Sequence, residues 1–329
     1  MSFKPDALKL QKEYSFKGIL FGIARIDERL FLAASDFQVY EAAIAKDKLD
    51  LQPCYKHESY VTSLAVAKDV VISGSYDCKL TWYHTVTKKV IRSETAHDRW
   101  IRKVVVSPDQ KTVVSVADDM IGKVWDVETG KLKFELISHE QKTPTGFGSM
   151  LYTACFSHDG KWIATADKVG KIFVWEANTG KRVQELHSPG MYTWEPVARL
   201  HSIGGIRSIA FDPSNQRIAV GGIGKIGNID HLEGKARLEM FEWNTAKSLG
   251  VYESGAHKGL NNVVRFSEDG KWLLAAGGAG NGHMIFLDAA TLKPIREEKS
   301  SFHVHEMLMD EAKSHLITVG HQKLATYQA

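Results

Sequence analysis

The sequence of 329 residues contains little cysteine and proline and no long hydrophobic run. Its three cysteines, Cys54, Cys78 and Cys155, are an odd number without a CxxC pair, which argues against a disulfide framework. We therefore expect buried, reduced thiols and a cytoplasmic protein. No segment approaches the roughly 20 apolar residues that a bilayer-spanning helix requires, and the first six residues lack the apolar core of a secretory signal. No membrane association is expected.

Neither sign of charge predominates, because 42 basic and 39 acidic residues leave a formal net charge of only +3. No run rich in Lys and Arg stands out, so the sequence does not indicate a nucleic-acid partner. Catalytic motifs are missing as well: we find no nucleophile elbow, no HExxH and no closely spaced set of Cys and His. The sequence therefore indicates no catalytic residue, no metal and no cofactor.

The sequence does contain a motif that recurs at a period near forty residues. It consists of a histidine, an apolar strand, a polar turn, a second strand, and an aromatic residue followed by an acid. The clearest copy extends from His97 through Ser107-Pro108-Asp109 to Trp125-Asp126. Such repeats predict a modular all-β architecture, and the fixed period favours a propeller over a sandwich or barrel.

Seven copies are counted from the expected inner strands, which precede the turns. Five copies are distinct and two are degenerate, and their inner strands are predicted at residues 61–66, 101–106, 152–156, 206–211 and 263–266, with the degenerate ones at 19–27 and 305–312. The third strand of each copy carries the aromatic position, which is filled by Tyr40, Tyr83, Trp125, Trp175, Phe241, Leu287 and Tyr327.

This pattern resembles the WD40 repeat family over essentially the whole chain. The resemblance implies a hydrogen-bonded relay of His, Ser or Thr, Asp and Trp inside each blade. In the third unit the relay positions are His97, Ser115, Asp119 and Trp125, and in the second they are His57, Ser73 and Asp77, with Tyr83 in the Trp position. The fourth unit keeps His139, Thr165 and Trp175, but Val169 stands where the acid is expected; units five to seven retain His201, His257 and His303 with weak partners.

We therefore predict an all-β, seven-bladed β-propeller of four-stranded antiparallel blades, forming a single domain over residues 1–329. The blades are expected at about 16–56, 57–96, 97–138, 139–186, 201–255, 256–302, and 303–329 plus 6–15. Residues 7–14 alternate between apolar and polar, as an outer strand does. This N-terminal strand is expected to complete the last blade and close the ring, because an open ring would leave unpaired strand edges.

The histidines are explained as blade-forming residues rather than metal ligands, since copies one blade apart cannot converge on one ion. Function is expected where the repeat is interrupted, at the insertions 140–150, 187–204 and 224–236. By resemblance to the family, all three should lie on one rim around blades four and five, and binding residues concentrate on such loops. The candidate partner-binding residues are Trp194, Tyr192, Trp100, Tyr60, Lys225 and Arg199. For Trp194, a plug folded onto its own loop is an equal alternative, as is packing against the next blade for Trp100 and Tyr60.

The expected function is that of a monomeric, non-catalytic scaffold that binds a protein or peptide. The competing hypothesis is a small-molecule-binding or hydrolytic propeller that uses the same rim or the central channel, with Asp230, His231 and Glu233. A weaker third possibility is a structural propeller whose insertions pack only against one another. The run Gly222-Ile223-Gly224-Lys225-Ile226-Gly227 matches a dinucleotide fingerprint in form only, because no helix is expected after it.

Overall fold

The computed structural model describes residues 3–45, 48–197, 199–228 and 230–329. Two compact units divide the chain: the first comprises residues 1–135 with 305–329, and the second comprises residues 136–304. Both units are built from antiparallel sheets, so the all-β class is confirmed. The single domain stays a prediction. No helix in the described part of the chain is long and apolar enough to cross a membrane.

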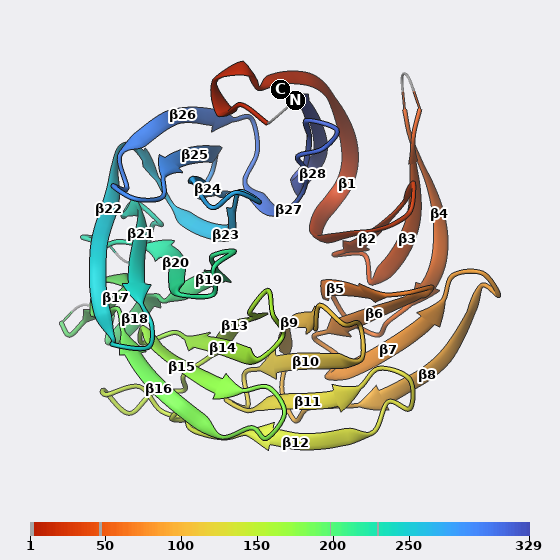
Figure 1. Ribbon diagram of the computed structural model, residues 1–329, viewed down its shortest axis with the longest axis horizontal. Coiled ribbons are helices and arrows are strands. Elements are labelled where there is room, and N and C mark those ends of the chain that lie inside the picture. Colours follow the sequence, from red (N-terminus) through yellow and green to blue (C-terminus); the bar gives the residue numbers. More distant parts are fainter. Residues whose placement is uncertain (1–2, 46–47, 198, 229) are drawn as a thin grey trace. The chain divides into compact units, whose positions relative to one another are not determined.

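The first unit consists of one six-stranded and two four-stranded sheets (Figure 1). The six-stranded sheet has the order β27-β28-β1-β2-β3-β4, and the other two have the orders β5-β6-β7-β8 and β12-β11-β10-β9. Their bounds are β1 Lys9–Ile26, β2 Arg29–Ala34, β3 Gln38–Ile44, β4 Leu49–Lys56, β5 Val61–Ala67, β6 Val70–Ser75, β7 Lys79–His84, β8 Lys89–Thr95, β9 Ile101–Val106, β10 Thr112–Ala117, β11 Gly122–Asp126, β12 Leu132–Leu136, β27 Val304–Asp310 and β28 His315–Gln328.

The second unit consists of three four-stranded sheets, each in sequence order, and a two-stranded ribbon of β17 and β18. The strands are β13 Leu151–Phe156, β14 Trp162–Asp167, β15 Lys171–Glu176, β16 Arg182–His187, β17 Tyr192–Glu195, β18 His201–Gly204, β19 Ile206–Phe211, β20 Arg217–Ile223, β21 Lys235–Glu242, β22 Lys247–Lys258, β23 Leu260–Phe266, β24 Trp272–Gly278, β25 Gly282–Asp288 and β26 Pro294–Ser300. Two short 3-10 helices are also present, η1 Pro5–Ala7 in the first unit and η2 Pro189–Met191 in the second.

The fold is an all-β β-propeller with four-stranded antiparallel blades, but the predicted count of seven blades is wrong, since the described residues show six, each a sheet of four or more strands. The reason is the 18-residue strand β1, whose first half pairs with β28 and whose second half pairs with β2. Strands from the first and last repeats therefore share one sheet. The expected pairing of the N-terminal strand with the last strand is present, from Lys9 opposite Gln328 to Ser15 opposite Lys323; closure of the ring stays a prediction.

The polar turns of the repeat explain why the inner and second strands pair. In the turn after β9, Ser107 Oγ donates to Asp109 Oδ1 over 2.5 Å and accepts from the backbone N–H of Thr112 over 3.0 Å. The fourth turn residue, Gln110, has a left-handed φ of 60°. Its counterpart Gly160, in the turn after β13, has a φ of 70°. A serine, an acid and a left-handed residue thus fix a tight hairpin and its register.

The core lies between neighbouring sheets of each unit. In the first unit, one cluster joins β5–β8 to β9–β12 through the buried side chains of Trp82, Ile101, Val104 and Trp125. In the second unit, an equivalent cluster joins β19–β22 to β23–β26. The second strands of the blades, such as β10, β14 and β24, are buried along almost their whole length, which accounts for their continuous apolar character.

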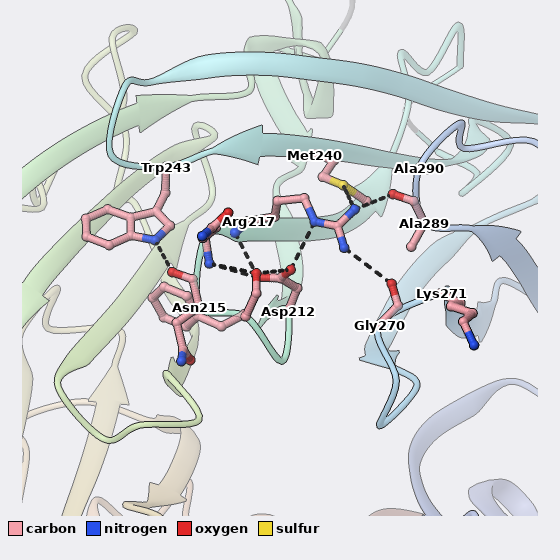
Figure 2. Close-up of polar contacts among 12 residues, drawn as sticks. Asp212, Asn215, Arg217, Met240, Trp243, Gly270, Lys271, Ala289 and Ala290 are labelled. Atoms are coloured by element: carbon pink, nitrogen blue, oxygen red, sulfur yellow. Dashed lines mark hydrogen bonds and ion pairs between the residues drawn. The ribbon is translucent and has the colours of Figure 1, made fainter. Parts of the chain in front are cut away.

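Arg217 on β20 adds a polar link between those two sheets of the second unit (Figure 2). Its Nε donates to Asp212 Oδ2 over 3.0 Å, and its terminal nitrogens donate to the backbone oxygens of Ala289 over 2.6 Å and Gly270 over 3.3 Å. Burial alone raises the pKa of Asp212, but the hydrogen bonds of Ser214 and Arg217 lower it below its ordinary value. The buried carboxylate therefore stays ionised and paired with Arg217 within the β19–β20 hairpin, while the same guanidinium reaches the neighbouring sheet.

The three cysteines are free, and each is half-buried rather than fully buried as predicted. Cys54 and Cys78 lie in the first unit and Cys155 in the second. Burial raises the pKa of the Cys54 and Cys78 thiols, which favours the unreactive protonated form at neutral pH. The compartment stays a prediction.

Candidate functional site

The histidine relays are built inside the blades. In the sheet β9–β12, His97 Nδ1 lies 2.8 Å from Asp119 Oδ2, and its Nε2 lies 2.7 Å from Ser115 Oγ. The indole N–H of Trp125 donates to the same hydroxyl over 3.0 Å. His97 and Ser115 are buried, so these side chains bond to one another and face no ligand.

Two relay assignments made from the sequence need correction. In the fourth unit the acid is Asp167, whose Oδ2 lies 2.8 Å from His139 Nδ1, and Val169 only donates its backbone N–H to Asp167. In the second unit Tyr83 does stand in the Trp position, because it pairs with Val71 as Trp125 pairs with Val113, but the hydroxyl of Tyr55 is the group that donates to Ser73 Oγ, over 2.8 Å. Tyr55 reaches this position from β4, the outer strand of the preceding sheet.

Of the later histidines, His201 is exposed on β18 and takes part in no relay among the described residues. His303 bonds to the Ala279 carbonyl oxygen over 3.1 Å and to Asn262 over 2.6 Å. His305, at the start of the last predicted inner strand, and His321 stack with ring centroids 5.0 Å apart in the first unit. Burial lowers the pKa of His321.

Tyr60 and Trp100 belong to a continuous aromatic surface in the first unit. Each immediately precedes an inner strand, and 42% and 49% of their surfaces are exposed. Tyr76, from the turn after β6, lies between them: its ring stacks on Trp100 at 4.5 Å and 9°, and its centroid is 5.9 Å from that of Tyr60. These three rings form a platform that extends over two neighbouring sheets.

Two phenylalanines extend the platform onto the six-stranded sheet. The Tyr60 ring lies 5.6 Å from Phe37 and 5.9 Å from Phe21. We call Phe21, Phe37, Tyr60, Tyr76 and Trp100 the aromatic row. The sequence pattern does not single out Phe21, Phe37 and Tyr76. A signal for two of them was present. Phe37 and Tyr76 lie in turns that follow second strands, and by resemblance to the family these turns should open on the same face as Tyr60 and Trp100, which precede inner strands.

Arg102 fixes the Trp100 end of the row. Its guanidinium carbon lies 4.9 Å from the Tyr76 ring centroid and 5.4 Å from that of Trp100. Asp118 accepts two hydrogen bonds from this guanidinium, at 2.8 and 2.6 Å, and the Tyr76 hydroxyl accepts a third. A bidentate ion pair holds the cation in place, so the stacked rings form a rigid exposed surface.

The other candidates lie in the insertions of the second unit. Tyr192 and Trp194 are half-buried on β17, which pairs with β18 into a hairpin. The Trp194 ring lies 5.3 Å from Phe147 of the first insertion. Arg199 of the second insertion pairs with Asp230 of the third at 2.8 Å. The insertions therefore contact one another, and positions 198 and 229 within them lie outside the described residues.

The polar candidates of this region do not form one cluster. Lys225 is exposed, and no ion pair of its side chain is present among the described residues. Asp230 pairs with Arg199, whereas Glu233 lies 3.5 Å from Lys258. The glycine run from Gly222 ends β20 and leads through residues 224–228 and 230–234 to β21, with no helix in those ranges. A Cβ on Gly222 would lie 2.5 Å from the Gly205 carbonyl oxygen, so close packing explains that glycine.

Comparisons with known proteins agree with this architecture. Residues 88–126 match the WD40 family model described as "WD domain, G-beta repeat". This segment contains the complete relay of His97, Ser115, Asp119 and Trp125. The resemblance to the WD40 family is confirmed by this repeat match and by the propeller-like arrangement of four-stranded blades.

Three curated proteins illustrate the similarity. Apoptotic protease-activating factor 1 of Rattus norvegicus is 27% identical over 177 residues, which are 53% of this chain and 13% of that protein. U3 small nucleolar RNA-interacting protein 2 of Mus musculus is 33% identical over 93 residues, 27% of this chain and 19% of that protein. Small ribosomal subunit protein RACK1y of Oryza sativa is 23% identical over 116 residues, 35% of this chain and 32% of that protein. The chain thus covers less than a third of the length of each.

Proposed function

We propose that this protein is a non-catalytic scaffold that binds a protein or peptide partner through the aromatic row of the first unit. The observation that carries the proposal is the exposed stack of Trp100 on Tyr76, continued by Tyr60. Large aromatic side chains held rigid at a surface contribute most of the binding energy in many protein interfaces, since they bury a large area at little cost in side-chain entropy.

Arg102 supports this assignment because it restricts the conformational freedom of the Trp100 and Tyr76 side chains in the unbound protein. Its pairing with Asp118 keeps the guanidinium over the two stacked rings. A preorganised surface loses little conformational entropy on binding. The relatives' names add support of a general kind, since they describe a protease-activating factor, an RNA-interacting protein and a ribosomal subunit protein.

The insertion rim of the second unit is a separate candidate surface for a partner. Phe147, Val197 and Leu200 are exposed there beside Trp194. Arg199 and Lys225 supply polar groups at its edge. Because the Trp194 ring already packs against Phe147, we assign it a smaller share of the binding energy than Trp100.

The test compares partner capture by the wild-type chain and by a Trp100→Ala/Tyr60→Ala variant, with bound proteins quantified by mass spectrometry. Loss of a hot-spot aromatic costs about 2 kcal/mol, or roughly 30-fold in Kd, so specific partners should be depleted. Val86→Ala is the matched control, because Val86 is exposed in the turn between β7 and β8, away from the row. Retention of every partner by the double variant contradicts the proposal.

Two further arms separate the remaining alternatives. A Trp194→Ala/Tyr192→Ala variant reports on the insertion rim, and identical partner lists would remove that rim from the site. Nuclease treatment before capture tests the prediction that no nucleic acid takes part, since a partner held through RNA would be lost. Light scattering of the purified chain tests the predicted monomer.

A further inference from the structure

The sheet β23–β26 lacks the acid that completes the relay in three other blades. In those blades, a carboxylate at the end of the second strand or in the turn after it bonds to the Nδ1 atom of the histidine; the pairs are His57 with Asp77, His97 with Asp119, and His139 with Asp167. In β23–β26, Gly278 pairs with Gly282, and the hairpin between them is Ala279-Gly280-Asn281. No carboxylate is present in this hairpin.

The relay hydroxyl is missing from the same blade. Ser115 follows the Val113–Trp125 pair by two residues, and the corresponding residue after the Leu273–Leu287 pair is Ala275. His257 is nevertheless retained and buried. Its Nε2 lies 3.7 Å from Glu297 Oε2, and no carboxylate of the described residues pairs with its Nδ1. The histidine of this blade therefore has no acid in the relay position.

A cleft of about 330 Å³ opens at this corner of the second unit. Its lining includes His257, His283, Lys258, Lys299 and the hairpin 279–282. A Cβ built on Gly280 would meet nothing within 4 Å, so the hairpin borders open space. The cleft thus borders both His257 and the hairpin that lacks the acid, and it is large enough for a small organic group.

The charges around the cleft favour an anion. Lys258 and Lys299 are exposed at its edge, whereas Glu233 is the one acid in the lining and lies 3.5 Å from Lys258. Burial lowers the pKa of His257, and the charge of Lys299 adds to this effect against the opposing charge of Glu297. Burial likewise lowers the pKa of His283 to about 3, and its Nε2 lies 2.8 Å from Asn261 Oδ1. Two neutral imidazoles and two ammonium groups therefore face the cavity.

We propose that this cleft binds a carboxylate group, which takes the place of the relay aspartate beside His257 and between Lys258 and Lys299. The site lies outside the aromatic row and does not depend on the proposed partner. The carboxylate belongs either to a free small acid or to an acidic side chain of a peptide, and both sources present the same group to the same residues.

The experiment follows the His257 ring signals by NMR while the intact chain is titrated with succinate, with the peptide acetyl-Gly-Glu-Gly-amide, or with inorganic phosphate. A carboxylate probe should shift the His257 signals in a saturable manner. Lys258→Ala/Lys299→Ala should weaken binding at least tenfold. Lys293→Ala is the matched control, because Lys293 is exposed in the turn between β25 and β26 and should leave the affinity unchanged.

A second variant supplies the missing acid within the chain. Asn281→Asp is nearly isosteric and should occupy the site itself, abolish binding of the probe and raise the pKa of His257. Saturation by succinate alone assigns the site to a small acid, and saturation by the peptide assigns it to an acidic segment. The proposal is overturned if neither carboxylate binds, if phosphate alone binds, or if both variants bind the probe as the wild type does.

Discussion

At the scale of single residues, the relays show how one hydroxyl organises a blade. Ser115 Oγ receives the indole N–H of Trp125 and contacts His97 Nε2, and all three side chains are buried. A buried polar group that loses its partner keeps the cost of its desolvation. The relay serine therefore stabilises the blade mainly by keeping two ring nitrogens bonded.

We predict that Ser115→Ala lowers the free energy of unfolding by about 1–3 kcal/mol, because two buried ring nitrogens lose their partner. Urea denaturation monitored by tryptophan fluorescence measures the change. Thr129→Ala, in the exposed turn after β11, should stay within about 0.5 kcal/mol of the wild type. Equal effects of the two substitutions would rule out the stabilising role of the relay.

The fourth unit shows that a fixed spacing between the relay hydroxyl and the relay acid does not always locate the acid. Asp77 and Asp119 lie four residues after their relay hydroxyls, and the same offset from Thr165 leads to Val169. Asp167 reaches His139 from only two residues beyond Thr165, because the backbone N–H groups of Val169 and Lys171 orient its other oxygen. Backbone geometry of the turn, rather than residue count, selects the acid.

At the scale of elements, β1 is the strand with the largest structural consequence. Its N-terminal half pairs with β28, and Lys323 Nζ adds an ion pair to Glu13 at 2.6 Å. The buried side chains of Tyr14, Phe16 and Leu324 pack in the same cluster. Removal of this half would expose the edge of β28 and part of the core below it.

Deletion of residues 1–15 is therefore expected to lower the melting temperature by several degrees, since a strand and its buried side chains are lost. Differential scanning calorimetry measures the shift. Lys12→Ala keeps the strand and removes only a half-buried side chain, so it serves as the control. An unchanged melting temperature after the deletion would show that the pairing contributes nothing to stability.

At the scale of the whole molecule, the buried His–Asp pairs couple stability to pH. Burial alone would raise the pKa of Asp77, but the hydrogen bonds from His57 and from the backbone N–H groups of Glu58 and Lys79 lower it to about 2. The folded-state pKa lies below the value of about 3.9 in the unfolded chain. The stability contributed by this carboxylate is thus present above about pH 4 and is lost as the pH falls through about 2.

We predict that Asp77→Asn destabilises the protein at pH 6 and that the difference from wild type shrinks between about pH 4 and pH 2. Urea midpoints of the two proteins across this range provide the measurement. Glu128→Gln, at an exposed carboxylate in the turn after β11, is the matched control at each pH. A difference that stays constant down to pH 2 would mean that the ionised form of Asp77 is not the stabilising one.

Much of the fold follows from the sequence, whereas the candidate site follows only in part. The predicted inner strand at 101–106 coincides with β9, and that at 206–211 coincides with β19, because apolar runs and polar turns are local signals. The merger of the first and last repeats depends on a pairing between residues more than 300 positions apart. The stack of Tyr76 on Trp100 joins neighbouring sheets, and no local pattern encodes such a contact.

The position of β1 also has a consequence for synthesis. Its N-terminal half lies more than 300 residues before its partner, the last part of β28. During translation this strand therefore keeps an unpaired edge until β28 has been made. Long-range pairing of this kind slows folding and leaves strand edges open to aggregation. Until β28 is present, the N-terminal half of β1 is thus an open strand edge of the kind that can pair with another chain.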